Sequence, residues 1–290
     1  MTAVFLDYDQ ERLDYHIDVR RRVPAFASFS DRFAERSAAL RTRTRSHLDL
    51  RYGPHPRERL DVFLPDGVTD PVAANLFFHG GYWRSSEKER YSYVADLLLP
   101  AGAASVVVEY ALIPDVDMDE LIRQCRAALA WIHANGPEYS IDPARLFVSG
   151  HSAGGQIVGM LAAAGWHGDF GLPADVVRGA CGISGLYDLE PIRLSYLNSS
   201  LGLDADAARR NSPAFLPVAG PVPFIAAVGG DEGDEYLRQN SLVAAGWGAS
   251  TSVTTLVLDG LHHYSAVEAL GDASSALGRA VLGQMGLGAS

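Results

Sequence analysis

Short apolar segments alternate with helix-like segments along most of this chain, and this alternation constrains the fold more than any other feature. Several of the apolar segments are apolar at consecutive positions, as in parallel strands buried on both faces of a sheet. The predicted strands are residues 60–64, 75–78, 104–109, 145–149, 179–184, 223–228 and 252–258. Strand–helix–strand repetition predicts crossover connections and an α/β fold, with a mostly parallel central sheet covered by helices.

The clearest predicted helix lies between the third and fourth of these strands. Its apolar residues recur at helical spacing: Leu121, Ile122, Cys125, Ala128, Leu129 and Ile132. Asp117 and Glu120 have the spacing of a capping box at its start, and Gly136 with Pro137 ends it. Cys125 lies on the apolar stripe, so we predict a core residue and not a reactive thiol. With Cys181 as the other cysteine, the chain has no disulfide framework.

Two segments do not follow the alternation. Residues 1–50 are predicted to form an N-terminal helical arm of two polar stretches, broken near Val23 and Pro24. Phe26, Phe29, Phe33 and Leu40 recur on one face of this arm, which needs a surface to cover. Residues 186–222 form an insert of more than thirty residues between two strands, a length that is usually functional or mobile. We expect both segments to cover the functional edge of one domain, residues 51–290.

The charge of the chain excludes several classes of partner. The net charge is -11 at pH 7, which argues against nucleic acid and anionic membranes because phosphate contacts need a cationic surface. Lys88 is the only lysine, and no Gly-Lys-Ser/Thr sequence occurs, so a P-loop is excluded. The basic residues concentrate in residues 1–60, where solvated helix faces are the favoured interpretation.

The N-terminal sequence does not resemble a targeting segment. MTAVFLDYDQERLD has no long apolar run and carries Asp7 and Asp9, unlike a signal or transit peptide. No apolar stretch reaches the ~18 residues that a membrane helix needs. We therefore expect a cytoplasmic protein, and the sequence leaves its oligomeric state open, a homo-oligomer included.

A serine stands in a glycine-rich turn directly after a predicted strand. Gly150-His151-Ser152-Ala153-Gly154 follows residues 145–149 and leads into a helical segment. This is the context of a nucleophile elbow, a tight turn that exposes a serine Oγ. The flanking glycines fit because such a turn leaves no room for Cβ atoms beside the serine.

A second glycine turn, His79-Gly80-Gly81-Tyr82-Trp83, follows the strand 75–78. Glycines free the backbone so that its N–H groups can converge on one point, as an oxyanion hole requires. The alternative is a plain glycine turn, and the presence of Ser152 favours the oxyanion hole.

An acid and a histidine follow Ser152 in the chain order of a serine triad. Asp231 and Glu232 come directly after the strand 223–228, and His262 and His263 come after the strand 252–258. The ends of successive parallel strands meet at one edge of a sheet, so we expect these side chains to lie near Ser152.

These motifs resemble those of α/β-hydrolases of the kynurenine formamidase-like and hormone-sensitive-lipase-like esterase group. HGGYW is similar to the oxyanion motif of that group, and GHSAGG is similar to its serine elbow. Residues 182–189 and 109–114 resemble segments of the formamidase-like branch. The resemblance runs from about residue 50 to the C-terminus, and weakly across the N-terminal arm.

The resemblance implies a serine hydrolase without a cofactor that cleaves small carboxylic esters or aryl amides through an acyl-enzyme. It assigns the nucleophile to Ser152, the general base to His263 and the acid to Glu232. The acid departs from the pattern, because formamidases usually have aspartate and Asp231 stands beside Glu232. Gly229 plus three residues gives Glu232, which favours the glutamate and leaves Asp231 as the alternative.

The backbone N–H groups of Gly81, Tyr82 and Ala153 correspond to the oxyanion hole of the family. Tyr82 and Trp83 are candidates for the substrate pocket, with simple packing an equal alternative. His79 and His151 are expected to hold loops by hydrogen bonds. The other histidines are scattered or lack further ligands at metal spacing, so we expect no metal.

Two other functions remain open. The first is a true arylformamidase that cleaves N-formylkynurenine, because the motifs are shared between formamidases and general esterases. The second is a hydrolase-fold binding protein that has lost catalysis, although no member of the triad is missing from the sequence.

Overall fold

An eight-stranded, mostly parallel sheet forms the centre of the computed structural model, which describes residues 2–288. The strands are β1 (Arg45–Arg51), β2 (Arg59–Leu64), β3 (Val72–Phe78), β4 (Ala104–Val108), β5 (Ile141–His151), β6 (Val177–Ile183), β7 (Phe224–Gly229) and β8 (Val253–Leu258). They lie in the order β1-β2-β4-β3-β5-β6-β7-β8. β2 is antiparallel to both of its neighbours, whereas β4 to β8 are parallel to one another. The predicted α/β fold is confirmed.

The sequence pattern predicts β2 to β8 and misses β1. The expectation that residues 1–50 are helical is wrong for residues 45–50, which belong to this strand. The sequence of β1, RSHLDLR, has no apolar run, and all of its residues are exposed or half-buried. The reason is its position: β1 pairs only with β2, at the edge of the sheet, so neither of its faces needs to be wholly apolar.

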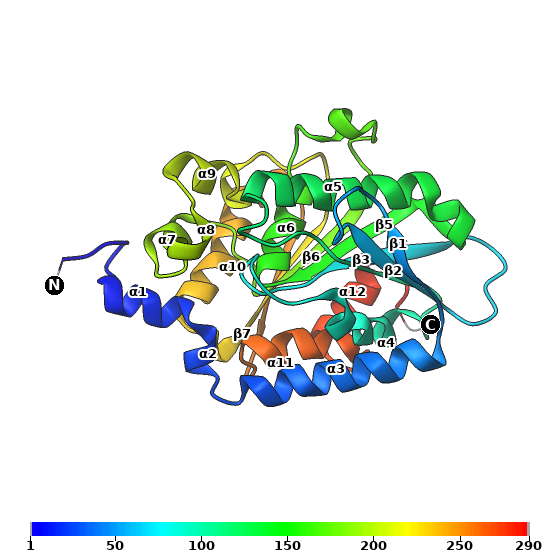
Figure 1. Cartoon of the computed structure of the whole chain (residues 1–290), viewed down its shortest axis with the longest axis horizontal. Coiled ribbons are helices and arrows are strands. Elements are labelled where there is room, and N and C mark those ends of the chain that lie inside the picture. Colours follow the sequence, from blue (N-terminus) through cyan, green and yellow to red (C-terminus); the bar gives the residue numbers. More distant parts are fainter. Residues whose placement is uncertain (1, 289–290) are drawn as a thin grey trace.

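Helices cover both faces of the sheet, which gives three layers (Figure 1). The α-helices are α1 (Gln10–Ile17), α2 (Val19–Arg22), α3 (Phe26–Arg43), α4 (Ala95–Leu98), α5 (Met118–Asn135), α6 (Ala153–Ala162), α7 (Glu190–Leu194), α8 (Asn198–Leu201), α9 (Ala205–Arg210), α10 (Asp234–Trp247), α11 (His263–Glu268) and α12 (Ala276–Gln284). The 3₁₀ helices are η1 (Lys88–Val94), η2 (Gly136–Tyr139), η3 (His167–Phe170), η4 (Pro213–Phe215), η5 (Gly230–Glu232) and η6 (Ala269–Gly271). Between residues 2 and 288, no helix has both the length and the apolar character to cross a membrane.

Alternate residues of each strand pack into different helical layers. In β3, Leu76 and Phe78 join the apolar cluster that contains residues of α5, α6 and α10, and Phe77 joins the cluster that contains residues of α3, α4, α11 and α12. All three side chains are fully buried. Coverage on both faces explains why the central strands are apolar at consecutive positions.

The predicted helix between β4 and β5 is α5, and its apolar stripe faces the core. Leu121, Leu129 and Cys125 are fully buried. The Asp117 side chain accepts the backbone N–H of Glu120, which caps the first turn. The Glu120 carboxylate binds Arg123 and does not complete the capping box.

The N-terminal arm is held to the body by buried contacts. Phe33 and Leu40 of α3 are buried beside η1. Arg41 donates to Asp61 of β2 at 2.5 Å, and Lys88 Nζ binds the same carboxylate at 3.0 Å. Removing α3 would therefore expose apolar core and leave a buried carboxylate with one cation fewer.

The insert of residues 186–222 carries α7, α8, α9 and η4 and lies next to the arm (Figure 1). Gln10 of α1 donates to the carbonyl oxygen of Leu194 at 3.0 Å, and Asp14 accepts the backbone N–H of Tyr196 at 2.9 Å. Arm and insert thus meet at one end of the sheet, beyond the carboxyl ends of its parallel strands.

Candidate active site

Ser152 lies in a strained turn between β5 and α6. Its φ is 58° and its ψ is -116°, a conformation that L-residues rarely adopt outside such sites. A Cβ atom on Gly150 would lie 2.3 Å from the carbonyl oxygen of Gly154, and one on Gly154 would lie 2.0 Å from that of Phe78. The turn therefore requires glycine at both positions, as the sequence motif predicts.

His263 is bound to a buried carboxylate at the end of β7. Its Nδ1 donates to Glu232 Oε2 at 2.6 Å. The other oxygen, Oε1, accepts the hydroxyl of Ser184 at 2.5 Å and the backbone N–H of Gly229 at 2.7 Å. Three donors thus hold the carboxylate, which leaves His263 Nε2 as the ring nitrogen that can accept a proton.

Arg22 of α2 binds the backbone of the loop that carries Glu232. Its guanidinium donates to the backbone carbonyl oxygen of Glu232 and, at 3.2 Å, to that of Asp231. It also occupies the space that a side chain at Gly233 would need. The N-terminal arm therefore contacts the loop that carries the acid.

The neighbouring residues Asp231 and His262 are directed elsewhere. Asp231 is exposed. His262 Nδ1 accepts the backbone N–H groups of Tyr264 and Ser265, each at 3.3 Å, which caps the start of α11. The ring of His262 also packs edge-on against Phe29.

The glycine turn after β3 lies beside Ser152. A Cβ atom on Gly80 would approach Ser152 Cβ to 3.1 Å. Gly81 has a φ of 120°, where a side chain would collide with the carbonyl oxygen of Ser85. Within residues 2–288 the backbone N–H groups of Gly81, Tyr82 and Ala153 donate no hydrogen bond, and Ala153 is the first residue of α6, where such groups are unpaired.

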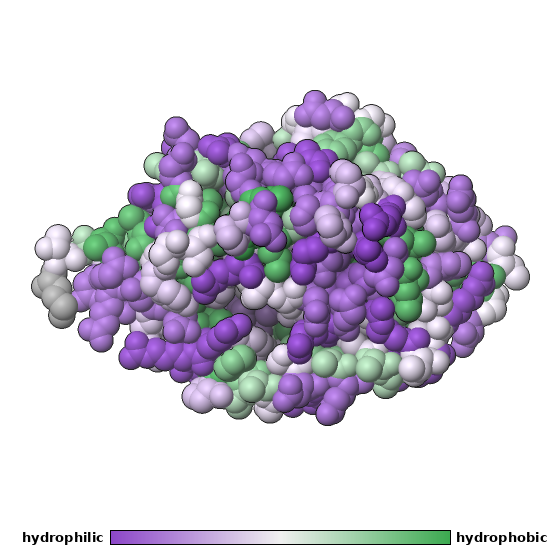
Figure 2. Space-filling model, viewed as in Figure 1, coloured by the Kyte–Doolittle hydropathy of each residue, from purple (hydrophilic) through white to green (hydrophobic). Residues whose placement is uncertain are grey.

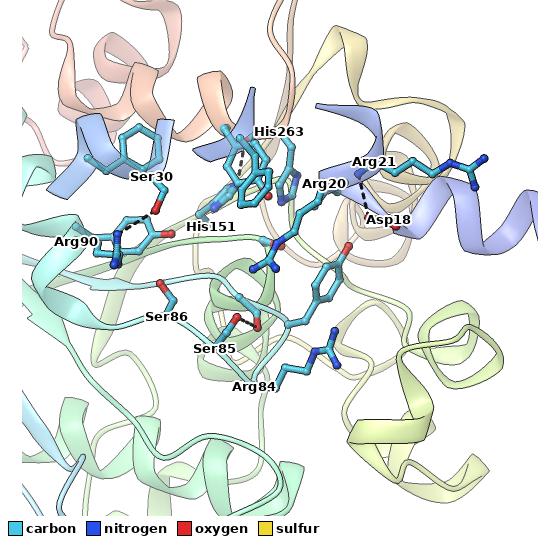
Figure 3. A pocket seen from close by; sticks show the side chains of 18 of the residues that line it. Asp18, Arg20, Arg21, Ser30, Arg84, Ser85, Ser86, Arg90, His151 and His263 are labelled. Carbon is cyan, nitrogen blue, oxygen red and sulfur yellow. Dashed lines mark hydrogen bonds between the residues drawn. The ribbon is translucent and has the colours of Figure 1, made fainter. Parts of the chain in front are cut away.

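A cavity of about 710 Å³ opens over Ser152 and His263, which both line it. Small-molecule sites have volumes of roughly 300–1,000 Å³, so this space fits a small ligand. Its lining residues include residues of the arm, of the glycine turn after β3, of the insert and of the start of α11 (Figure 3). Ser152 and His263 are not hydrogen-bonded to each other in the described residues.

The two aromatic pocket candidates differ in position. Tyr82 lines the cavity, and its hydroxyl donates to the carbonyl oxygen of Ile17 and contacts the Tyr236 hydroxyl at 2.8 Å. Burial raises the pKa of Tyr82 well above its usual range, so the phenol stays protonated. Trp83 is fully buried, is not among the lining residues, and donates its indole N–H to Gln156 at 3.0 Å. The structure therefore favours packing for Trp83.

His79 and His151 hold the loops around the site. His79 Nε2 contacts Glu109 at 3.0 Å, and Tyr110 donates to the His79 carbonyl oxygen at 2.6 Å. His151 Nε2 donates to the carbonyl oxygen of His263 at 2.9 Å. Burial, with His263 nearby, holds the pKa of His151 well below its usual range, so this ring adds no positive charge beside His263.

Three contributors to the site were not predicted from the sequence: Ser184, Arg22 and the arginines that line the cavity. Ser184 follows β6 directly, so its position at a strand end was the available signal. The contact of Arg22 with Glu232 joins residues 210 positions apart and has no motif. Among residues 2–288 no group of three or more His, Cys, Asp or Glu side chains could hold a metal ion.

The strand order, the serine turn between β5 and α6, and the acid and histidine after β7 and β8 define an α/β-hydrolase fold. Comparison with known proteins agrees. The BD-FAE family model matches residues 60–174. A kynurenine formamidase of Danio rerio is 29% identical over 279 residues, which cover 92% of this chain and 89% of that protein.

Similar solved structures extend over nearly the whole chain. The crystal structure of a putative thioesterase from Silicibacter sp. TM1040 has a TM-score of 0.79 and 29% identity, covering 92% of this chain and 97% of that one. Esterase B of Lactobacillus rhamnosis has a TM-score of 0.71 at 19% identity, covers 96% of each chain and supports the fold alone. The chain is a hydrolase with the α/β-hydrolase fold, and it is similar to the kynurenine formamidase-like and hormone-sensitive-lipase-like esterase group.

Proposed function

We propose that this hydrolase cleaves small carboxylic esters or aryl amides by a serine mechanism, with Ser152, His263 and Glu232 as the triad. The observation that carries the proposal is the 2.6 Å bond between His263 Nδ1 and Glu232 Oε2, on a histidine that lines the same cavity as the serine of the strained turn. An oriented histidine and a serine that line the same cavity form the arrangement that activates a serine nucleophile.

In the first step, Ser152 Oγ attacks the carbonyl carbon and passes its proton to His263 Nε2. The Glu232 carboxylate stabilises the imidazolium that forms, and its bonds to Ser184 and Gly229 keep it in place. The neutral state of His151 avoids a second positive charge next to that imidazolium.

The tetrahedral intermediate places a negative charge on the former carbonyl oxygen. The N–H groups of Gly81, Tyr82 and Ala153 are the donors that we assign to this oxyanion, because they have no partner among residues 2–288 and lie in the glycine turn beside Ser152 and directly after Ser152. The Tyr82 side chain, bonded to Ile17 and Tyr236, helps to fix the first of these turns.

Collapse of the intermediate transfers the proton from His263 to the leaving group and leaves an acyl-enzyme on Ser152. Water, deprotonated by His263, then attacks the acyl carbon and releases the acid product. The direct test is Ser152→Ala, which should lower kcat on p-nitrophenyl acetate by roughly 10⁴ or more. If the folded variant kept a tenth of wild-type activity, the serine mechanism would be wrong.

The second candidate function is hydrolysis of N-formylkynurenine. It is favoured by the kynurenine formamidase of Danio rerio, whose similarity covers 92% of this chain. Comparing kcat/KM for N-formylkynurenine with that for p-nitrophenyl acetate and longer esters separates the two candidates. A protein that bound these substrates without turning any over would instead support an inactive, ligand-binding hydrolase fold.

We further propose that residues 1–50 act as an arm over the site, that residues 51–290 form the hydrolase domain and that the enzyme works in the cytoplasm. Support for the arm comes from Asp18, Arg20 and Phe26, which line the cavity. Cell fractionation followed by immunoblotting tests the location.

A further inference from the structure

Four of the residues that line the active-site cavity are arginines. They are Arg20, Arg21, Arg84 and Arg90. One carboxylate, that of Asp18, is present among the lining residues in the described part of the chain, and it accepts the backbone N–H of Arg21 as the N-cap of α2. The cavity therefore carries a positive excess, although the whole protein carries a net charge of -11.

Three of the arginines, Arg90, Arg84 and Arg20, differ in whether a partner neutralises their charge. Arg90 forms an ion pair with Glu87 at 3.2 Å. Arg84 donates to a neutral partner, the Ser200 hydroxyl, at 2.8 Å. The guanidinium of Arg20 stacks over the Phe26 ring at 5.0 Å, a contact that orients the side chain without cancelling its charge. Within residues 2–288, neither Arg20 nor Arg84 forms an ion pair.

The direction of the side chains separates Arg20 from Arg21. In Figure 3, Arg20 extends from α2 into the cavity, whereas the neighbouring Arg21 extends away from it. Arg84 enters the view from the opposite wall. The surface over α2 is strongly hydrophilic in the space-filling view (Figure 2). Two walls of the cavity thus present cationic groups that have no carboxylate partner in the part of the chain that the structure describes.

We infer that the cavity selects esters or amides whose acyl or leaving group carries a carboxylate, and that Arg20, assisted by Arg84, binds that group. The inference rests on the proposed serine hydrolase function, because the same cavity must hold the reacting carbonyl. A guanidinium matches a carboxylate with two parallel N–H donors and keeps its charge at every physiological pH. Arg20 and Arg84 are exposed, as Arg21 is, and what separates Arg20 from Arg21 is that its side chain extends into the cavity.

The test uses two matched pairs of esters. In the first pair, p-nitrophenyl hydrogen adipate carries a carboxylate in its acyl group and p-nitrophenyl hexanoate does not. In the second pair, 4-acetoxybenzoate carries it in the leaving group and methyl 4-acetoxybenzoate does not. The measured quantity is the kcat/KM of the anionic ester divided by that of its neutral counterpart, after subtraction of the spontaneous rate.

For at least one pair, the wild type should favour the anionic ester, and Arg20→Gln should lower the ratio roughly tenfold, mainly through KM. Arg84→Gln should lower it less, and Arg21→Gln, the matched control, should leave it unchanged. Added salt should reduce the wild-type ratio, because these side chains are partly solvated.

Two outcomes contradict different claims. If the neutral esters were turned over and neither ratio responded to Arg20→Gln, the inference of an anionic substrate would be wrong and the hydrolase proposal would stand. If none of the four esters were turned over and the serine were unreactive, the proposed function itself would be wrong. Thermal melts of the three variants check that each is folded.

Discussion

Replacing Glu232 by glutamine should reverse the tautomer of His263 and nearly abolish turnover. In the wild type, Glu232 Oε1 accepts two donors, the Ser184 hydroxyl and the Gly229 N–H, while Oε2 accepts His263 Nδ1–H. A glutamine side chain has one oxygen and one NH₂ group. The two fixed donors will retain the oxygen, so the NH₂ group will face His263.

An NH₂ group in that position requires an acceptor at His263 Nδ1, which moves the ring proton to Nε2. A protonated Nε2 cannot take the proton of Ser152. The same change in the aspartate of a serine protease triad costs about 10⁴ in kcat, so we expect a loss of roughly 10²–10⁴ in Glu232→Gln. At about 1.4 kcal/mol for each tenfold change, this is about 3–6 kcal/mol of transition-state stabilisation.

The assay is the steady-state hydrolysis of p-nitrophenyl acetate, with thermal melts to show that the variants are folded. Asp231→Asn is the matched control, because it removes one negative charge from the adjacent, exposed side chain. We expect Asp231→Asn to keep near-normal kcat. If Asp231→Asn lost most of its kcat and Glu232→Gln kept a nearly normal kcat, the assignment of the acid and the tautomer argument would both be refuted.

Three further predictions concern neighbouring groups. His263→Ala should lower kcat by roughly 10⁴, whereas His262→Ala should cost far less because its side chain caps α11; steady-state kinetics with the opposite ranking would overturn the base assignment. Arg22→Gln should lower kcat roughly three- to tenfold with little change in KM, because the guanidinium binds the backbone of the loop that carries Glu232. Arg21→Gln is the control, and equal kcat values in the two variants would show that the arm does not position the triad. His151 stays neutral in the folded state, so acidification below about pH 6.5 protonates it only in the unfolded chain. Acidification therefore lowers the free energy of unfolding, by at most about 1.4 kcal/mol per pH unit. In denaturant titrations between pH 7 and 5, the free energy of unfolding should decline less steeply in His151→Gln than in the wild type, and an unchanged slope would contradict the pKa argument.

The central strands could be predicted because buried strands need apolar residues, and these residues can be recognised in the sequence. β3 to β7 are covered on both faces, so they are apolar at consecutive positions. β1 has no run of apolar residues, because an edge strand whose residues are exposed or half-buried can have a polar sequence. The serine elbow could be predicted for a different reason. A Cβ atom at Gly150 or Gly154 would collide with the backbone, so both positions require glycine and leave a recognisable motif.

The site was predictable only where chemistry and chain order coincide. Ser152, Glu232 and His263 each follow a strand directly, and parallel strand ends converge at one edge of the sheet. The supporting contacts were not predictable. Arg22 reaches Glu232 because α2 lies across the loop after β7, and Arg20 faces the cavity because of the path of the arm. Neither side chain belongs to a motif, and both look like solvated residues in the sequence.

The most direct test of the central claim is intact-mass spectrometry of the protein after treatment with a fluorophosphonate. The serine mechanism predicts one adduct per chain in the wild type, located on Ser152 by peptide mapping, and no adduct in folded Ser152→Ala. His263→Ala should be labelled far more slowly, because the serine then has no base. An adduct that persists in Ser152→Ala, or that maps to another residue in the wild type, would contradict the account.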